Sequence, residues 1–218
     1  MESVFLIGKG KSAQLDTSLY QTRTKTYTSF LTYTYGLVAD IDIDSEVLRF
    51  LGNARQLVYA VWKIMTFNVY HGRFSYLPPD AADTKNIPKS IEEPLPDKDW
   101  ITLEDKVITI WASHVSHASY DLHNSPQSKI DDGVFEIMVL KYPISRLKLI
   151  QVFLDIETGK HVQHKDVISF LSCVAYRWEP SSSTRQSYNN VDGEVVEAGP
   201  IQASIQPQSL QVFVNPTS

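Results

Sequence analysis

The sequence is poor in the features that mark secreted, membrane-spanning or nucleic-acid-binding proteins. Its single cysteine among 218 residues, Cys173, excludes an internal disulfide and favours a reducing compartment. No apolar run approaches the roughly 20 residues that cross a bilayer, and the N-terminus has no signal-peptide pattern. The net charge of −5 does not favour nucleic acid as a partner. We therefore expect a soluble, cytoplasmic protein that can still associate peripherally with a membrane.

Two classes of enzymatic site also lack their motifs. There is no Gly-x-Ser-x-Gly sequence, which the nucleophile of an α/β-hydrolase needs. Two histidine pairs, His114-x-x-His117 and His161-x-x-His164, have no cysteine nearby and lie in strand-like or loop segments. Structural zinc sites combine four cysteine and histidine ligands. We therefore expect neither a hydrolase nor a zinc protein.

What is present is the composition of one large globular domain that is rich in β-strands. Hydrophobic residues make up 43% of the chain and charged residues 21%, which is sufficient for a sizeable core. Runs of β-branched and aromatic residues predict strands. These runs are residues 27–35, 107–112, 134–140, 167–176 and 209–214. Asp192-Gly193, between two short runs, predicts a hairpin turn.

Two other segments predict helices. The first begins after Asp44-Ser45, two good N-caps, and keeps helical spacing of its apolar residues to Met65, with a kink or a break at Gly52. The second runs from about residue 145 to residue 157 and is followed by a glycine that can end it. Its apolar face consists of Leu147, Ile150, Phe153 and Leu154. We therefore predict a mainly β fold, an antiparallel β-sandwich that carries two or three helices.

Residues 78–99 form the one long irregular segment. It contains five prolines and mixed charges. Both features oppose regular secondary structure, so we predict a mobile loop.

The most informative segment is residues 36–46, GLVADIDIDSE, in which four carboxylates occur within seven residues: Asp40, Asp42, Asp44 and Glu46. Like charges repel, so such a cluster suits a helix cap, a bound cation or a solvated surface. In the simplest interpretation, Asp44 caps the helix and Glu46 pairs with Arg49, while Asp40 and Asp42 end an exposed strand. A Mg²⁺ or Ca²⁺ site is the first alternative, although the spacing excludes an EF-hand.

Two arginines in the same region suggest an anion. Arg49 and Arg55 would point about 120° apart on a straight helix, whereas a break at Gly52 would let them converge. Two converging guanidinium groups suit a polyphosphate. The alternative is a pair of solvated surface arginines.

Residues 36–55, GLVADIDIDSExxRxxGxxR, closely resemble the segment that follows the catalytic domain of sphingosine kinases, which belong to the diacylglycerol kinase superfamily of lipid kinases. The resemblance covers nearly the whole chain in order. It continues through YxGRxxYLP (70–78), DGVFE (132–136), ExGxH (157–161), YRWEP (176–180) and VDGE (191–194). The Asp-Gly-Glu part of the last motif is shared with ceramide kinases.

The resemblance implies a C-terminal lipid-binding β-sandwich spanning residues 1–218, in which helices form a lid over a buried lipid pocket. It implies ATP-dependent phosphorylation of sphingosine to sphingosine 1-phosphate, with ATP and Mg²⁺ as cofactors. It assigns the head group of sphingosine to Asp42, with Glu46 as its acidic neighbour. It assigns ATP phosphates to Arg49, Arg55, Asp192 and Glu194, and the metal to Glu194.

The family's N-terminal nucleotide-binding domain, with its Gly-Gly-Asp-Gly signature and its general base, is missing from these residues. We therefore expect this chain to be an inactive half of a lipid kinase when it is alone, with the missing domain as its partner. The alternatives are a non-catalytic, regulatory lipid-binding β-sandwich, or part of a ceramide or diacylglycerol kinase. The apolar segment 58–70 predicts core or pocket lid, and otherwise contact with a membrane surface or a calmodulin-like protein.

Overall fold

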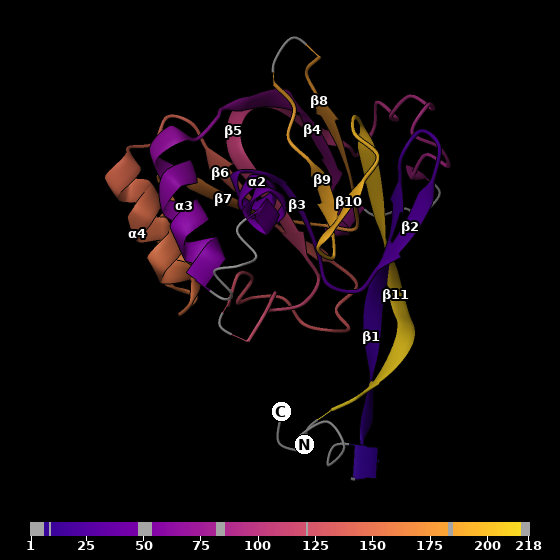
Figure 1. Cartoon of the computed structure of the whole chain (residues 1–218). Coiled ribbons are helices and arrows are strands. Elements are labelled where there is room, and N and C mark those ends of the chain that lie inside the picture. The colour runs from indigo at the N-terminus through magenta and orange to yellow at the C-terminus, as the bar shows by residue number, and fades with distance from the viewer. Residues whose placement is uncertain are drawn as a thin grey trace.

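The structure is a computed structural model that describes residues 7–8, 10–47, 54–81, 86–120, 122–182 and 185–214, with the backbone only for residues 54–57. Strands and helices are arranged as one curled sheet with helices against it (Figure 1). None of the described helices is long and apolar enough to cross a membrane.

The sheet contains eleven antiparallel strands. They are β1 (Ser12–Gln21), β2 (Thr26–Ser29), β3 (Thr32–Gly36), β4 (Tyr70–Leu77), β5 (Ile101–Ser113), β6 (Phe135–Lys141), β7 (Ile168–Cys173), β8 (Ala175–Pro180), β9 (Asn189–Val191), β10 (Glu194–Val196) and β11 (Ile201–Phe213). The main path is β10-β9-β3-β5-β4-β8-β11-β1-β2, and β6 and β7 continue from β5. The long strand β5 therefore pairs with β3, β4 and β6, which lets the sheet curl into the predicted sandwich-like form.

An aromatic core fills the inside of the curled sheet. It contains Tyr20, Tyr33, Tyr176, Trp178 and Phe135, all with no exposed surface. Their rings pack edge-to-face or tilted, for example Phe135 on Tyr176 with centroids 5.2 Å apart, a favourable arrangement for aromatic pairs. Away from this core, β1 and β11 pair along their whole length and extend as a ribbon (Figure 1).

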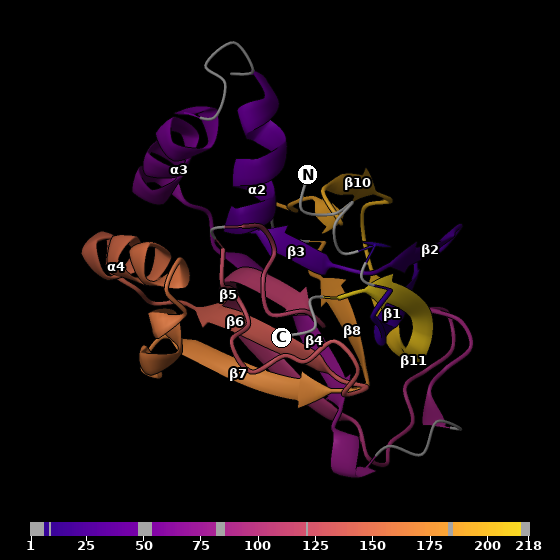
Figure 2. The same cartoon turned by 90° about the horizontal axis from the view of Figure 1, so that it is seen from below.

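The helices lie together on one side of the sheet (Figure 2). They are α2 (Leu37–Asp44), α3 (Ala54–Thr66) and α4 (Arg146–Ile156), and the short 3₁₀ helix η4 (Lys160–Gln163) contacts α4. Another 3₁₀ helix, η2 (Pro79–Ala81), follows β4. A second core fills the space between these helices and β5, β6 and β7. Its largest members are Leu37, Ile41, Ile108, Trp111, Met138 and Leu149.

The prediction of the second helix is confirmed. Ser145 caps α4 by accepting a hydrogen bond from the amide of Lys148. The buried side of the helix is Leu149, Val152 and Ile156. Of the apolar face read from the sequence, Leu147 (81% exposed), Ile150 and Leu154 face outward, whereas Phe153 is half-buried against the second core. The helix is apolar on both sides, so spacing alone did not reveal which side is core.

The predicted start of the first helix is wrong. Helix α2 begins at Leu37, directly after β3, so Asp40 and Asp42 lie in a helix rather than at the end of a strand. Ser45 is its C-cap and not an N-cap. The turn is possible because Gly36 has φ +84°, and a Cβ there would lie 2.3 Å from the carbonyl oxygen of Ile108. Gly52, where we predicted a break, lies outside the described residues.

Local strand predictions are right in type but not always in extent, since residues 107–112 and 209–214 are parts of the longer strands β5 and β11. Residues 27–35 form two strands, β2 and β3, and residues 167–176 divide between β7 and β8. Strands β1 and β4 were missed. The hairpin at Asp192-Gly193 is confirmed, with φ of 51° and 86° joining β9 to β10.

Within the proline-rich segment, residues 86–99 are tied to the sheet by their carbonyl groups. Arg177 donates to the carbonyls of Ser90 and Glu93, and Gln202 donates to that of Pro88. Arg177 and Gln202 are buried on β8 and β11. These bonds favour an anchored segment over the mobile loop that composition suggested, because moving it would leave buried donors unpaired.

Candidate functional site

The structure brings the acidic segment of α2 against residues 187–190, which lead into the Asp-Gly-Glu hairpin. Ser187 Oγ donates to Asp40 Oδ1 at 2.5 Å, and Tyr188 Oη donates to Asp44 Oδ1 at 2.8 Å. Asn190 Nδ2 donates to Asp42 Oδ2 at 2.9 Å. Each carboxylate of α2 therefore has its own partner on one distant segment, and two motifs that the sequence separates by about 150 positions form one site.

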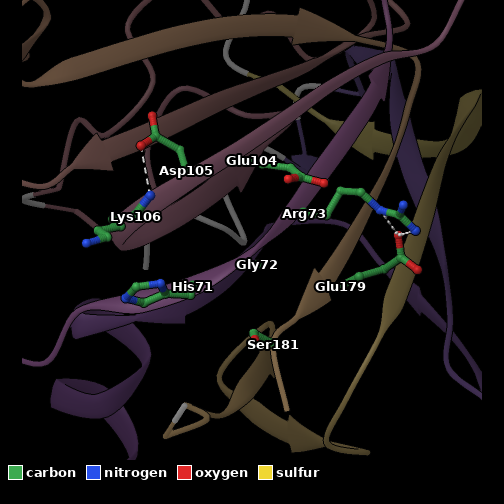
Figure 3. Close-up of a pocket in the computed structure, with 8 residues that line it drawn as sticks. All are labelled: His71, Gly72, Arg73, Glu104, Asp105, Lys106, Glu179 and Ser181. Carbon is green, nitrogen blue, oxygen red and sulfur yellow. Dashed lines mark hydrogen bonds and ion pairs between the residues drawn. The ribbon is translucent and has the colours of Figure 1, made fainter. Parts of the chain in front are cut away.

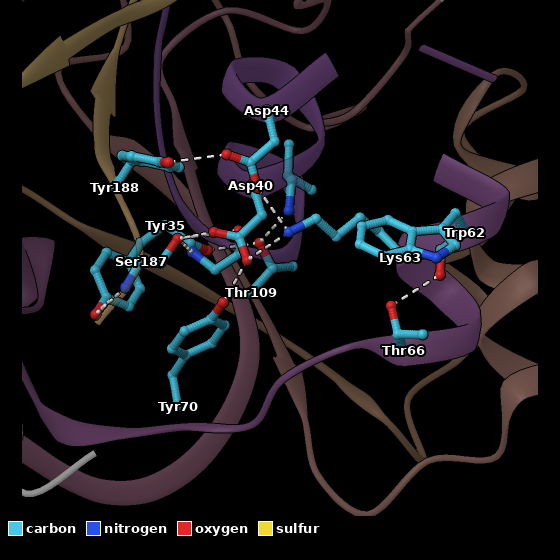
Figure 4. A network of polar contacts seen from close by, with 12 residues as sticks. Tyr35, Asp40, Asp44, Trp62, Lys63, Thr66, Tyr70, Thr109, Ser187 and Tyr188 are labelled. Carbon is cyan, nitrogen blue, oxygen red and sulfur yellow. Dashed lines mark hydrogen bonds and ion pairs between the residues drawn. The ribbon is translucent and has the colours of Figure 1, made fainter. Parts of the chain in front are cut away.

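Two of the three carboxylates are neutralised from the opposite side by a lysine. Lys63 of α3 is 4% exposed, and its Nζ lies 2.7 Å from Asp44 Oδ2 and 3.6 Å from Asp40 Oδ2 (Figure 4). Tyr70 Oη also donates to Asp40 Oδ2, at 2.5 Å. A buried charge is tolerated only where it is paired and hydrogen-bonded. This network therefore holds α2, α3 and β4 together.

The network shifts the acidity of its members. Burial by itself would raise the pKa of Asp44, but hydrogen bonds from Lys63 and Tyr188 outweigh it, so this pKa lies below the ordinary value. Burial, followed by the adjacent Asp40 carboxylate, raises the pKa of Tyr70 well above its usual range. Asp44 is therefore ionised and Tyr70 is protonated near neutral pH.

Asp42 differs from its two neighbours. It is half-buried, and within the described part of the chain its carboxylate has a neutral amide as its partner and no cation within ion-pair distance. A carboxylate whose hydrogen-bond donor is neutral is not compensated by an opposite charge. Such a group suits a cationic ligand.

The other predicted binding residues of this region are less well placed. Glu46 is exposed in the turn that follows α2. Arg49 lies outside the described residues, and Arg55 is described only as backbone in the first turn of α3. The convergence of the two arginines and the pairing of Glu46 with Arg49 therefore stay predictions.

The hairpin residues have contrasting surroundings. Asp192 accepts hydrogen bonds from Ser29 Oγ at 2.7 Å and from the amides of Phe30 and Thr32 at 3.1 and 2.9 Å. These bonds give it a structural role in the turn between β2 and β3. Glu194 is exposed on β10. Among the described residues no cluster of three or more histidine, cysteine, aspartate or glutamate side chains could hold a metal, so Glu194 offers a single carboxylate.

Sequence reasoning missed Lys63, Tyr70 and the contacts of residues 187–190. Only Lys63 left a usable signal. It is the one charged residue in the otherwise apolar or neutral stretch 56–70, and a lysine within a helix that packs on a core needs a buried partner. Two of the four carboxylates that the sequence crowds nearby, Asp40 and Asp44, are its partners.

The larger cavities lined by described residues are polar. One cleft of about 690 Å³ lies beside β4, β5 and β8 and is lined by His71, Arg73, Lys106 and Glu179 among others (Figure 3). Another of about 650 Å³ lies beneath the proline-rich segment. Neither is the closed apolar pocket that the resemblance implies, and the core beneath the helices is filled by side chains. The lipid pocket stays a prediction.

Helices α3 and α4 carry an exposed apolar surface, which we call the helical face. It consists of Val58, Val61, Trp62 and Met65 of α3 and Leu147, Ile150 and Leu154 of α4. The two helices are in contact, and Arg146 Nε donates to the carbonyl of Met65 at 2.9 Å. Two adjacent helices with exposed Trp, Met and Leu indicate a surface that binds an apolar partner.

Comparison with known proteins connects this fold to lipid kinases. Residues 101–214 match the family model of the YegS C-terminal NAD kinase beta sandwich-like domain. Sphingosine kinase 1 of Rattus norvegicus is 27% identical over 197 residues, which are 84% of this chain and 51% of that protein. Sphingosine kinase 1 of Arabidopsis thaliana is 26% identical over 213 residues, 88% of this chain and 44% of that protein. The chain spans about half the length of these curated relatives.

Solved structures support the fold. The crystal structure of a candidate diacylglycerol kinase from Bacillus anthracis str. Sterne superposes with a TM-score of 0.60 at 18% sequence identity, covering 97% of this chain and 61% of that one. At this identity the likeness concerns the fold alone. This likeness supports a β-sandwich-like fold for the chain.

Proposed function

Because the chain belongs to the family of YegS C-terminal NAD kinase beta sandwich-like domains, we propose that it is the acceptor-binding half of a sphingosine kinase. The full reaction would transfer the γ-phosphate of ATP to the primary hydroxyl of sphingosine, giving sphingosine 1-phosphate. One observation carries the proposal. Of three carboxylates on α2, Asp42 has a neutral partner while Asp40 and Asp44 share Lys63.

Asp42 would bind the ammonium group of the sphingoid base. A charge-assisted hydrogen bond between ammonium and carboxylate is stronger than one between neutral groups. A neutral acceptor such as ceramide or diacylglycerol would leave the half-buried carboxylate without a counter-charge, which is costly. Glu46 would add to the negative potential that attracts the base.

The phosphate side of the site would combine this chain with a nucleotide-binding domain. Arg49 and Arg55 would hold ATP phosphates, while Asp192 and Glu194 would face them from the hairpin. Mg²⁺ prefers a few carboxylates together with phosphate oxygens, and the exposed Glu194 fits as one such ligand. The metal would neutralise charge that develops during phosphoryl transfer.

The lipid tail and the membrane would meet this chain at its helices. The tail would enter beneath α2, α3 and α4 by displacing side chains of the second core, at a gain of about 0.8 kcal/mol for each buried CH₂. The helical face would rest on the bilayer that contains the substrate. A calmodulin-like partner could cover the same apolar surface of α3.

The test is titration calorimetry of this chain with sphingosine, ceramide and diacylglycerol in matched detergent. We expect sphingosine alone to bind measurably, and Asp42→Asn to weaken it at least tenfold with an unchanged circular dichroism spectrum. Asp44→Asn is the matched control, since Asp44 is on the same helix but is neutralised by Lys63. Equal binding of the three lipids, or unchanged affinity in a folded Asp42→Asn variant, would contradict the proposal.

Two other functions remain as alternatives. Preferred binding of diacylglycerol or ceramide would indicate a kinase of that lipid. The diacylglycerol kinase description of the structural neighbour makes diacylglycerol the first to examine. If sphingosine binds but the chain joined to a nucleotide-binding domain transfers no phosphate, a regulatory lipid-binding role replaces catalysis.

A further inference from the structure

Among the described residues, the buried side chain of Asn190 uses its amide nitrogen but not its amide oxygen in hydrogen bonds. Its side chain is 4% exposed at the β9 end of the site. Its Nδ2 donates to Thr34 Oγ1 at 3.1 Å and to Asp42 Oδ2 at 2.9 Å. Its Oδ1 is buried without a partner in the described part of the chain. A buried acceptor without a partner lowers stability, so the amide contributes chiefly through the bonds that it donates.

The neighbouring Asn189 uses both atoms of its side-chain amide in hydrogen bonds. It is 1% exposed, and its Oδ1 accepts a bond from Tyr33 Oη at 2.9 Å. Its Nδ2 donates to the carbonyls of Glu197 and Gly199, at 2.7 and 3.0 Å. Asn189 therefore uses both amide atoms to stabilise the β9–β10 hairpin, and these bonds do not involve α2. Two adjacent asparagines, equally buried, thus serve different parts of the molecule.

Helix geometry explains why Asn190 meets Asp42 and not its neighbours. Successive residues of an α-helix are about 100° apart, so Asp42 points roughly 160° away from Asp40 and from Asp44. Lys63 approaches the side of α2 that carries Asp40 and Asp44. Asn190 reaches Asp42 from β9. One carboxylate is thereby oriented by a donor that has no charge.

We propose that Asn190 is the positioning residue that orients Asp42 for the acceptor's ammonium group without neutralising it. This inference rests on the proposed function. A lysine or arginine at this place would satisfy Asp42 with an internal cation, whereas an amide fixes one oxygen and leaves the charge for the ligand. Asn190 thus selects a cationic amphiphile over a neutral one. It also ties the head-group site to the hairpin that carries Asp192 and Glu194, because it lies on the strand that precedes them.

The decisive experiment compares Asn190→Ala with Asn189→Ala in this chain. We expect Asn190→Ala to raise the dissociation constant for sphingosine about tenfold, the loss of one hydrogen bond to a charged group, with little change in melting temperature. We expect Asn189→Ala to lower the melting temperature clearly and to leave sphingosine affinity within about twofold. Calorimetry measures the affinities, and thermal circular dichroism measures the melting. The reverse order of the two effects, or equal loss of affinity in both variants, would overturn the inference.

A second variant gives a readout that a merely structural role would not move. Asn190→Asp keeps the shape of the side chain but places a carboxyl group within hydrogen-bond distance of Asp42. Two close carboxylates hold on to one proton, so the pKa of the pair rises. The pH at which sphingosine binding is lost on acidification should therefore move upward relative to the unmodified chain. An unchanged pH profile in a folded variant would contradict a direct action on Asp42.

A double-mutant cycle separates failure of this inference from failure of the proposed function. If Asn190 acts through Asp42, then Asn190→Ala should have little further effect in the Asp42→Asn background. Full additivity of the two losses would reject the inference while leaving Asp42 as the head-group residue. No loss of affinity in Asp42→Asn itself would instead reject the proposed function.

Discussion

The two cores of this protein are similarly buried but differ in what covers them. The aromatic core inside the sheet consists of fully buried side chains, among them Phe135 and Trp178. The core beneath the helices is covered by α3 and α4, whose outer sides remain apolar, with Trp62 55% exposed and Leu154 66% exposed. The first core therefore supplies rigidity, whereas the helical layer presents uncovered apolar surface and the charge of Asp42. This difference is the reason that we place the proposed binding site in the helical layer.

The largest effect should come from the aromatic core. Phe135→Ala should lower the free energy of unfolding by about 3–5 kcal/mol, because it removes buried contacts and leaves a cavity. Leu154→Ala, on the exposed helical face, should change it by less than about 0.5 kcal/mol. Urea denaturation monitored by tryptophan fluorescence measures both. Similar losses would mean that the helical face is covered in solution, for example by a second copy of the chain.

A somewhat smaller loss in the free energy of unfolding should follow removal of the Lys63 charge. Lys63→Met should destabilise the chain by about 3 kcal/mol, since Asp40 and Asp44 would keep their charges without a cation. Lys148→Met is the control, because its ion pair with Asp166 at 3.2 Å is on the surface and such pairs contribute about 0–1 kcal/mol. If urea denaturation gives equal values for both, the buried network does not hold the helical layer to the sheet.

Acid should weaken the same network gradually. The pKa of Asp44 is lower in the folded chain than in the unfolded one. Its stabilising contribution is therefore present above the unfolded pKa, about 3.9, and is lost as the pH falls through the folded pKa. Asp44→Asn should be less stable than the unmodified chain at pH 7 and should lose less stability below about pH 4. Asp131→Asn, a change at an exposed carboxylate, should show neither difference in denaturation series across this range.

The smallest effect on stability should accompany a clear effect on membrane binding. Val61→Ser with Trp62→Ser should alter unfolding by about 0.5 kcal/mol or less, since both side chains are more than half exposed. Sedimentation with phosphatidylcholine–phosphatidylserine vesicles should show at least tenfold weaker association, because the anchoring apolar area is gone. Unchanged association would indicate that the helical face binds a protein instead of a bilayer.

Local features were predictable from the sequence, and features that depend on distant contacts were not. The extent of the second helix and the turn at Asp192-Gly193 follow from chemistry within a few residues, and both were found. The start of α2 was misplaced because Asp44-Ser45 is a strong local capping signal. The actual start depends on the close approach of Gly36 to Ile108, which no local pattern reveals. The family and the acidic segment were recognisable from motifs.

By itself, the sequence determined that the chain is β-rich, that four carboxylates crowd one short segment, and that its motifs are those of a lipid kinase half. It did so because hydrophobic pattern and motif spacing are local properties. Only the tertiary structure decided which carboxylates of α2 pair with a lysine and which one has a neutral amide as its partner. That choice depends on Lys63 and Asn190, and the contact between Asp42 and Asn190 joins residues 148 positions apart. Charge compensation acts through space and not along the chain.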